Sequence, residues 1–181
     1  TNPGDYCDVL VAMNPAALKA NVVWLKKDAT IILDGDTLDE KSIARAGFKT
    51  NDPLEELGIK EYNILTPDIT SLTKEALKDS GLDNKAIVKC KNMFALGICL
   101  YLYDKPMDHP KSYIQKKFGA KRPVVAEANI LALTAGYNYG NNTHAFANTY
   151  RVEAADLPKG LYRNINGNQA TAWGLLAASE K

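Results

Sequence analysis

The densest group of side chains that could do chemistry is acidic. The segment DGDTLDE (34–40) contains Asp34, Asp36, Asp39 and Glu40, directly after the apolar run ATIIL, which is typical of a buried strand. Ligands of parallel α/β sheets bind at the carboxyl ends of strands, and Mg²⁺ prefers carboxylate oxygens. A metal site is therefore one hypothesis. The spacing differs from a calcium loop and acidic turns are common, so we predict no metal ligand.

Histidine and cysteine show no pattern of a metal site or a catalytic site. His109 and His144 are the only histidines, both in loop-like sequence, and we expect them on the surface. Cys7, Cys90 and Cys99 are widely separated and lack the spacing of zinc or iron–sulfur ligands. We expect these three to be small buried side chains in a reducing cytoplasm.

The third candidate site is the start of the last helix, where NINGNQ (164–169) precedes an apolar run. Free N–H groups at a helix start bind anions, although Asn and Gly are also ordinary helix caps. Gly167 and Asn168 are the only cofactor-binding candidates, and both are weak. The sequence contains no GxGxxG pattern, P-loop or nucleophile elbow, and we predict no catalytic residue.

Strand, helix and strand alternate in the elements that would position these residues. CDVLVAMN (7–14) and ATIILDGD (29–36) are predicted strands, separated by a predicted helix over 15–28. Continuous apolar strands joined by a helix indicate a parallel α/β sheet. YNILTPD (62–68) is a further candidate strand.

Helices dominate the rest of the chain. The polar sequence over 138–149, which is interrupted by glycine, predicts a loop. Residues 149–156 suit either a strand or an extended connector. Helices are predicted over 71–81, 84–104, 109–119, 123–136 and from 168 onward.

The long predicted helix over 84–104 contains two unusual residues, Asn92 and Gly97. Glycine costs about 1 kcal/mol relative to alanine in a helix interior, so it indicates close approach of another element. Packing within the chain is the expected use, and a subunit contact is the alternative. Asn92 is expected to bond a neighbouring backbone group.

Composition excludes several classes of partner. The 181 residues are 46% hydrophobic and 24% charged, with a formal net charge of +1. This balance indicates a globular protein and gives no reason to expect nucleic acid or a membrane as partner. No apolar run approaches the ~20 residues that span a bilayer, and the first residues lack signal-peptide features.

The apolar last helix has nothing after it in the sequence to cover it. Ala170, Ala172, Trp173, Leu175 and Leu176 fall in a run that no glycine or proline ends before Lys181. We expect this helix to be the first element of a second domain. The uncovered helix and the missing initiator Met together lead us to expect that the chain is a piece of a longer protein.

Three segments, in order, resemble the 2-oxoacid:ferredoxin oxidoreductase family. The segment starting at residue 7 is similar to D-x-L-V-A-x-N in the γ domain, and KNMFALG (91–97) to its K-N-x-x-A-L-G segment. The last segment resembles G-N-E-A-x-A-x-G-x-x-A-A, which opens the α part, with Gln169 in place of Glu. The matching residues there are Gly167, Asn168, Ala170, Ala172, Gly174, Ala177 and Ala178.

The resemblance implies an α/β fold: a Rossmann-like three-layer γ domain without its Gly-rich start, over 1–146, and a connector over 147–160. The first helix of a pyrimidine-binding domain for thiamine diphosphate would follow, over 161–181. This γ-then-α order is that of members that prefer 2-oxoglutarate. The implied activity is oxidative decarboxylation of a 2-oxoacid to acyl-coenzyme A with electron transfer to ferredoxin.

The complete enzyme would contain thiamine diphosphate, Mg²⁺ and iron–sulfur clusters, none of them expected on this chain alone. A β subunit, ferredoxin and coenzyme A would be its partners in the cytoplasm, and this segment would serve mainly structure and subunit assembly. A free-standing α/β assembly module or small-ligand-binding module is the alternative. An NAD-linked enzyme is a third alternative, but it would require the GxGxxG pattern that the sequence lacks.

Overall fold

The computed structural model describes residues 6–143, 149–153 and 156–180. The chain divides into two compact units, residues 1–151 and 152–181. The first unit contains a three-stranded parallel sheet, so the expected α/β class is confirmed. The expected assignment of the two parts to a γ domain and a pyrimidine-binding domain stays a prediction.

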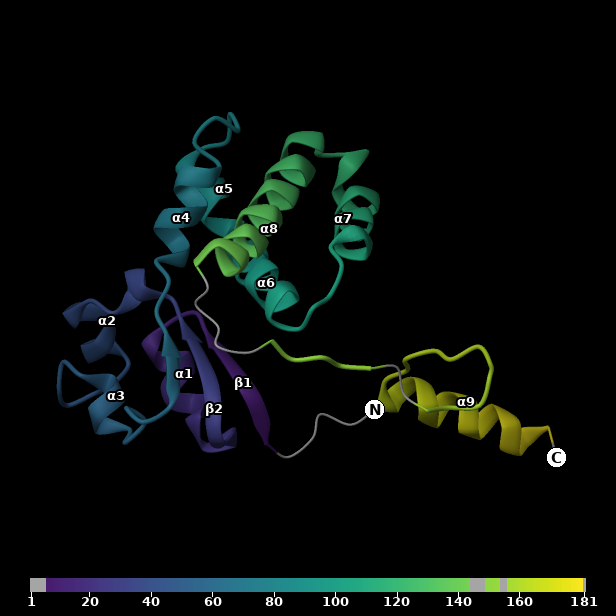
Figure 1. Cartoon of the computed structure of the whole chain (residues 1–181). Coiled ribbons are helices and arrows are strands. Elements are labelled where there is room, and N and C mark those ends of the chain that lie inside the picture. The colour runs from purple at the N-terminus through teal and green to yellow at the C-terminus, as the bar shows by residue number, and fades with distance from the viewer. Residues whose placement is uncertain (1–5, 144–148, 154–155, 181) are drawn as a thin grey trace. The chain divides into compact units, whose positions relative to one another are not determined.

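The sheet has the order β1 (Cys7–Ala12), β2 (Leu25–Leu33), β3 (Asn63–Leu65). In its register Val9 lies opposite Thr30, and Ile32 lies opposite Leu65. The crossovers contain α1 (Pro15–Asn21) and a 3-10 turn, η1 (Val22–Trp24), then η2 (Gly35–Thr37), α2 (Glu40–Arg45) and α3 (Pro53–Glu56). Figure 1 shows β1 and β2 side by side.

Both faces of the central strand are buried. Ile31 and Leu33 of β2 pack with Leu18 of α1 on one face, and Ile32 packs with Phe94 and other apolar residues on the opposite face. Side chains alternate between the faces of a strand, so a strand that is buried on both sides needs an unbroken apolar sequence. This explains the run that predicts β2.

The elements after β3 are helical: α4 (Ile69–Ala76), α5 (Asn84–Lys89), α6 (Lys91–Leu102), α7 (Asp108–Ile114), the π-helical η3 (Gln115–Gly119) and α8 (Pro123–Thr143). In the second unit α9 comprises Gly167–Ser179. Several expected boundaries are wrong. The helix expected over 84–104 is two helices that meet at Cys90, and the helix expected from 71 begins at Ile69.

The expected helix over 15–28 is too long. The α-helix ends at Asn21, and β2 has begun by Leu25, which pairs with Cys7 of β1. Lys26, expected at the end of the helix, lies in the strand and forms an ion pair with Asp8 at 2.9 Å. The β-branched Val22 and Val23 favour helix weakly, so pairing with β1 prevails over the helical pattern.

Helix α8 continues past Gly136, where we expected it to end, and residues 138–143 are helical rather than a loop. The reason is its contact with α6, beside which it lies in Figure 1. A Cβ added to Gly97 would lie 2.7 Å from the amide nitrogen of Tyr137, and one added to Gly136 would lie 2.7 Å from the Phe94 carbonyl carbon. The two glycines permit the helix backbones to touch, so the expected use of Gly97 in packing within the chain is confirmed. The side chain of Asn92 is exposed.

Residues 149–153 form neither helix nor strand, in agreement with an extended connector. The Tyr150 amide donates to the carbonyl of Leu102 at 2.7 Å, and its ring stacks on Tyr103 with centroids 5.3 Å apart. Residues 154 and 155 of the expected connector lie outside the described residues. The first unit therefore ends in a segment that is packed against α6 by its own side chain.

Candidate functional site

The acidic turn after β2 lies where the sequence predicts it, at the carboxyl edge of the sheet. Asp34 is completely buried. One carboxylate oxygen accepts hydrogen bonds from the Thr70 hydroxyl at 2.8 Å and from Lys91 Nζ at 3.2 Å, and the other accepts the Thr70 amide at 3.3 Å. The carboxylate is thus fully engaged by protein donors.

Asp36 makes the equivalent contact one residue further along α4. The Ser71 hydroxyl donates to one of its carboxylate oxygens at 2.5 Å, and the Ser71 amide to the other at 2.7 Å. Asp68, which occupies the N-cap position of α4, makes no side-chain capping bond. Two carboxylates from a distant loop therefore take over the N–H groups at the start of α4, which helix geometry leaves without partners.

The remaining acidic residues of this turn serve other elements. Asp39 caps α2 by accepting the Ser42 amide at 3.0 Å, and Glu40 accepts a bond from Asn51 at 3.3 Å. No group of three or more His, Cys, Asp or Glu side chains among the described residues could hold a metal ion. Asp34, Asp36 and Asp39 therefore accept hydrogen bonds from residues at the starts of helices.

The pKa of Asp36 reflects this contact. Partial burial on its own would raise the pKa, but the hydrogen bonds from the Ser71 hydroxyl and amide and from the Thr70 amide outweigh it, so the pKa lies below its ordinary value. A carboxyl whose pKa is lowered by folding stabilises the protein above its unfolded pKa. That stabilisation is lost as the pH falls through the folded pKa.

Ser71→Ala is therefore expected to lower the free energy of unfolding by about 1 kcal/mol at neutral pH, because it removes one donor to a charged acceptor. The difference from wild type is expected to close as the pH falls below the acidic range in which Asp36 titrates. Urea unfolding at several pH values measures it. Ser112→Ala is the control, since Ser112 is exposed. A difference that persists unchanged at low pH would contradict the role of the carboxylate.

Lys91 is the residue of this site that the sequence did not predict. Its side chain is 23% exposed and its Nζ lies 3.2 Å from the buried Asp34 carboxylate. It stands at the start of the apolar helix α6. A single lysine at the beginning of an apolar helix is a weak sequence signal, and only the fold brings the acidic turn to it.

His109 and Cys90 lie as the sequence predicts, whereas Cys7 and Cys99 are less buried than expected. His109 is exposed in α7, and His144 lies outside the described residues. Cys90 is buried, and Cys7 and Cys99 are partly buried. Burial raises the pKa of the Cys90 and Cys99 thiols, which favours the protonated form over the thiolate that binds metals.

The two cofactor-binding candidates lie in the first turn of α9. Asn166 caps this helix by accepting the Gln169 amide at 2.9 Å, and the Gln169 side chain accepts the Asn166 amide at 3.1 Å. This reciprocal pair is a capping box, built from residues three apart in sequence. It does not use the amides of Gly167 and Asn168, so whether they contact a cofactor stays a prediction.

Asn166→Ala is expected to destabilise α9 by about 1 kcal/mol, because the Gln169 amide loses its acceptor. Hydrogen exchange of the amides within α9 should then be about fivefold faster, as local opening becomes easier. The comparison variant is Gln169→Ala, which keeps the Asn166 acceptor and should have a smaller effect. Equal exchange rates in wild type and Asn166→Ala would show that the cap does not limit opening.

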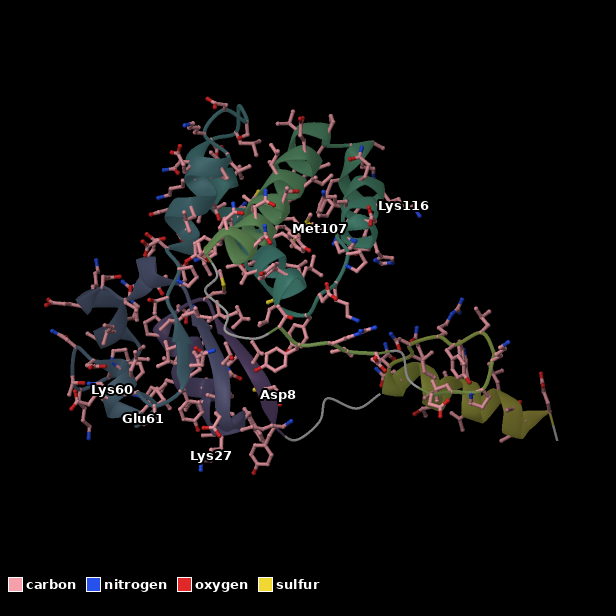
Figure 2. All side chains as sticks on the ribbon, in the orientation of Figure 1. Asp8, Lys27, Lys60, Glu61, Met107 and Lys116 are labelled. Atoms are coloured by element: carbon pink, nitrogen blue, oxygen red, sulfur yellow. The ribbon has the colours of Figure 1, made fainter. Side chains whose placement is uncertain are left out.

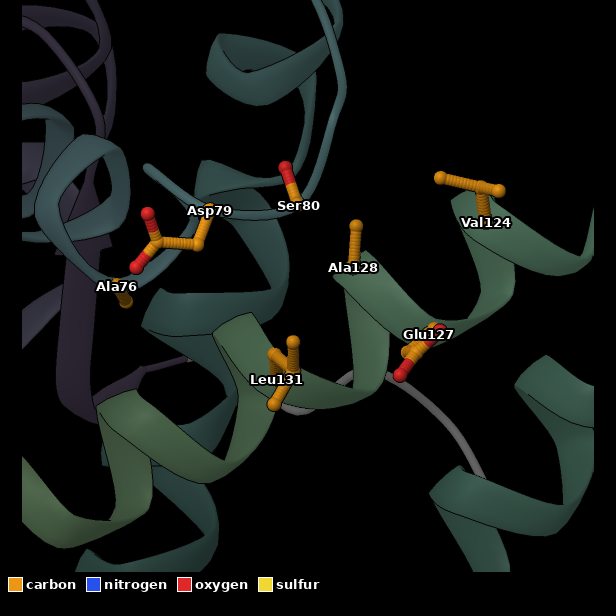
Figure 3. Close-up of a pocket in the computed structure, with 7 residues that line it drawn as sticks. All are labelled: Ala76, Asp79, Ser80, Val124, Glu127, Ala128 and Leu131. Carbon is orange, nitrogen blue, oxygen red and sulfur yellow. The ribbon is translucent and has the colours of Figure 1, made fainter.

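A shallow cavity of about 180 Å³ lies between the end of α4 and α8. Figure 3 shows Asp79 and Ser80 on one side and Val124, Glu127, Ala128 and Leu131 along α8 on the other. Asp79 and Glu127 make it an acidic hollow. Small-molecule sites in proteins usually occupy about 300 Å³ or more, so its size favours a surface depression over a substrate pocket.

No helix among the described residues is both long and apolar enough to cross a membrane.

Comparison with known proteins identifies the family. A model described as pyruvate ferredoxin/flavodoxin oxidoreductase matches residues 2–139. The 2-oxoglutarate oxidoreductase subunit KorA of Mycobacterium tuberculosis (strain ATCC 25618 / H37Rv) is 44% identical over 177 residues, 98% of this chain and 27% of that protein.

The chain thus spans 27% of the length of this curated relative. A search of solved structures finds no match. The family match covers both the acidic turn after β2 and the glycine contact between α6 and α8. The resemblance found in the three sequence segments is confirmed. The chain belongs to the pyruvate ferredoxin/flavodoxin oxidoreductase family.

Proposed function

We propose that this chain is part of a 2-oxoacid:ferredoxin oxidoreductase whose substrate is 2-oxoglutarate. The observation that carries the proposal is the 44% identity, over 98% of the chain, to a protein named as a 2-oxoglutarate oxidoreductase subunit. The complete enzyme would convert the 2-oxoacid to acyl-coenzyme A and pass electrons to ferredoxin. It would work in the cytoplasm with a β subunit.

Residues 1–146 would be the later portion of a Rossmann-like three-layer γ domain, 147–160 a connector and 161–181 the start of a pyrimidine-binding domain. The division of the chain into units 1–151 and 152–181 supports a boundary in this region. In α9, Leu175 is 68% exposed and Leu176 is 61% exposed. Exposed apolar side chains along one helix suit an element that packs against further domains.

In this proposal the chain's own residues provide architecture. Thiamine diphosphate, when bound in the complete enzyme, supplies the chemistry that decarboxylates a 2-oxoacid. Mg²⁺ and iron–sulfur clusters would complete that enzyme. The acidic turn does not offer Mg²⁺ free carboxylate ligands, because the carboxylates of Asp34 and Asp36 already accept hydrogen bonds from the start of α4 and from Lys91. The contact between Asp34 and Lys91 instead joins the edge of the sheet to α6.

The complete polypeptide, as its gene encodes it, should be co-expressed with the β subunit and tested with coenzyme A and ferredoxin. We expect 2-oxoglutarate to reduce ferredoxin with a kcat/KM at least about tenfold above that of pyruvate, since a substrate carboxylate that the site binds discriminates strongly. The control reaction omits coenzyme A. A preference for pyruvate, or no reduction with either 2-oxoacid, would refute the proposed substrate.

A further inference from the structure

We propose that a groove between α5, α6, α7, η3 and α8 binds an acidic segment of a partner protein, which inserts apolar side chains into two cavities. The groove includes Leu96, Tyr113, Phe118, Lys117, Arg122 and Lys89. We call it the basic groove. The inference concerns binding and is independent of the proposed substrate.

The shape of the groove comes from two cavities of about 280 and 240 Å³ that share Phe118 and Asn129 in their walls. Met93, Leu96 and Ile114 contribute apolar surface to the second cavity. Leu96 is 37% exposed and Tyr113 is 57% exposed. Each cavity is smaller than the usual small-molecule site of about 300 Å³ or more, which favours single side chains as occupants.

The charge of the groove is one-sided. Lys89, Lys117 and Arg122 line the cavities, and no Asp or Glu does. The segment 109–122 contains five Lys or Arg residues and no acidic residue, although the whole chain has a net charge of only +1. Figure 2 shows Lys116 pointing outward from this region. Positive charge around an apolar centre suits a partner that carries carboxylates around apolar anchors.

The cations of this segment make no ion pair within the part of the chain that the structure describes: the ion pairs there involve Lys26, Lys60, Lys78 and Lys91. Lys117 instead lies over the rings of Tyr113 and Phe118, 5.5 and 5.4 Å from their centroids. Acidic groups of a partner would supply what the chain itself does not. In contrast, the cavity between α4 and α8 is lined by Asp79 and Glu127.

Two other anionic partners fit less well. A membrane surface binds a continuous exposed apolar face, whereas here the exposed Leu96 and Tyr113 form the walls of a cavity. Nucleic acid binds through phosphates and through bases stacked on aromatic faces. In the groove Lys117 already lies over both rings, and the apolar cavities have no counterpart in a phosphate backbone.

The test uses the complete polypeptide and a fluorescein-labelled helical peptide with two anchors, Leu and Phe, one turn apart and flanked by Glu and Asp. Fluorescence anisotropy measures its binding. Lys116→Glu combined with Lys121→Glu is expected to weaken binding about tenfold or more, and both residues are exposed. The matched control is Lys41→Glu with Lys49→Glu, two exposed lysines elsewhere, which should leave the affinity unchanged.

A second variant, Tyr113→Ser, removes a cavity wall and should weaken binding of the acidic peptide by a similar factor. If Tyr113→Ser fails to fold, the Lys116→Glu/Lys121→Glu variant decides the test. Peptides with Ser for the anchors, or Gln and Asn for the acids, should bind weakly. Equal binding of these peptides, or no binding of the acidic peptide, would overturn the inference. Binding of phosphatidylserine vesicles or duplex DNA in its place, with the same dependence on Lys116 and Lys121, would also overturn it.

Discussion

Gly136→Ala is expected to destabilise the first unit by about 3 kcal/mol or more, although alanine favours helices over glycine by about 1 kcal/mol. The new Cβ would lie 2.7 Å from the Phe94 carbonyl carbon, much closer than the 3.4–4 Å of ordinary van der Waals contact. This neighbour is backbone and cannot rotate away. The two helices would have to separate, and the packing of Phe94 and Ile98 against the sheet would loosen with them.

Urea unfolding followed by circular dichroism measures this effect. The matched control is Gly174→Ala in α9, where an added Cβ meets nothing within 4 Å. That substitution should stabilise its helix slightly, as propensity alone predicts, and leave unfolding of the first unit unchanged. A Gly136→Ala protein as stable as wild type would show that α6 and α8 are not in close backbone contact.

Lys91→Ala is expected to cost about 3 to 5 kcal/mol, because it leaves the buried Asp34 carboxylate without its counter-ion. Asp34 has no exposed surface, so water cannot replace the ammonium group without a rearrangement of the sheet edge. The loss should appear as a lower urea midpoint. Since the same carboxylate accepts two bonds from Thr70, the start of α4 should loosen as well.

Lys26→Ala is the matched control, since it breaks an ion pair with Asp8 whose two side chains are 51% and 54% exposed. Its expected cost is about 1 kcal/mol or less, because solvent screens exposed pairs. The double variant Asp34→Asn with Lys91→Met should lose less than Lys91→Ala, as no unpaired charge remains. If Lys91→Ala behaved like Lys26→Ala, the buried pair would have no special role.

Features that depend on neighbouring residues were predictable from the sequence. The apolar runs indicated parallel strands because burial on both faces requires them, and β1 and β2 lie within the predicted ranges, apart from the earlier start of β2. The start of α9 was predicted to within one residue, since its capping box joins residues three apart. The family resemblance rested on three such local segments.

Features that depend on contacts between distant segments were decided by the tertiary structure. Helix α8 continues through Gly136 because α6 packs against that glycine, although glycine in isolation indicates an end. The sequence offered a metal site at Asp34 and Asp36 only as one hypothesis and predicted no ligand, but it did not show which groups these carboxylates would bind. The fold places Thr70, Ser71 and Lys91 around them. A carboxylate binds whichever donors the chain brings to it, and those donors lie more than thirty residues away.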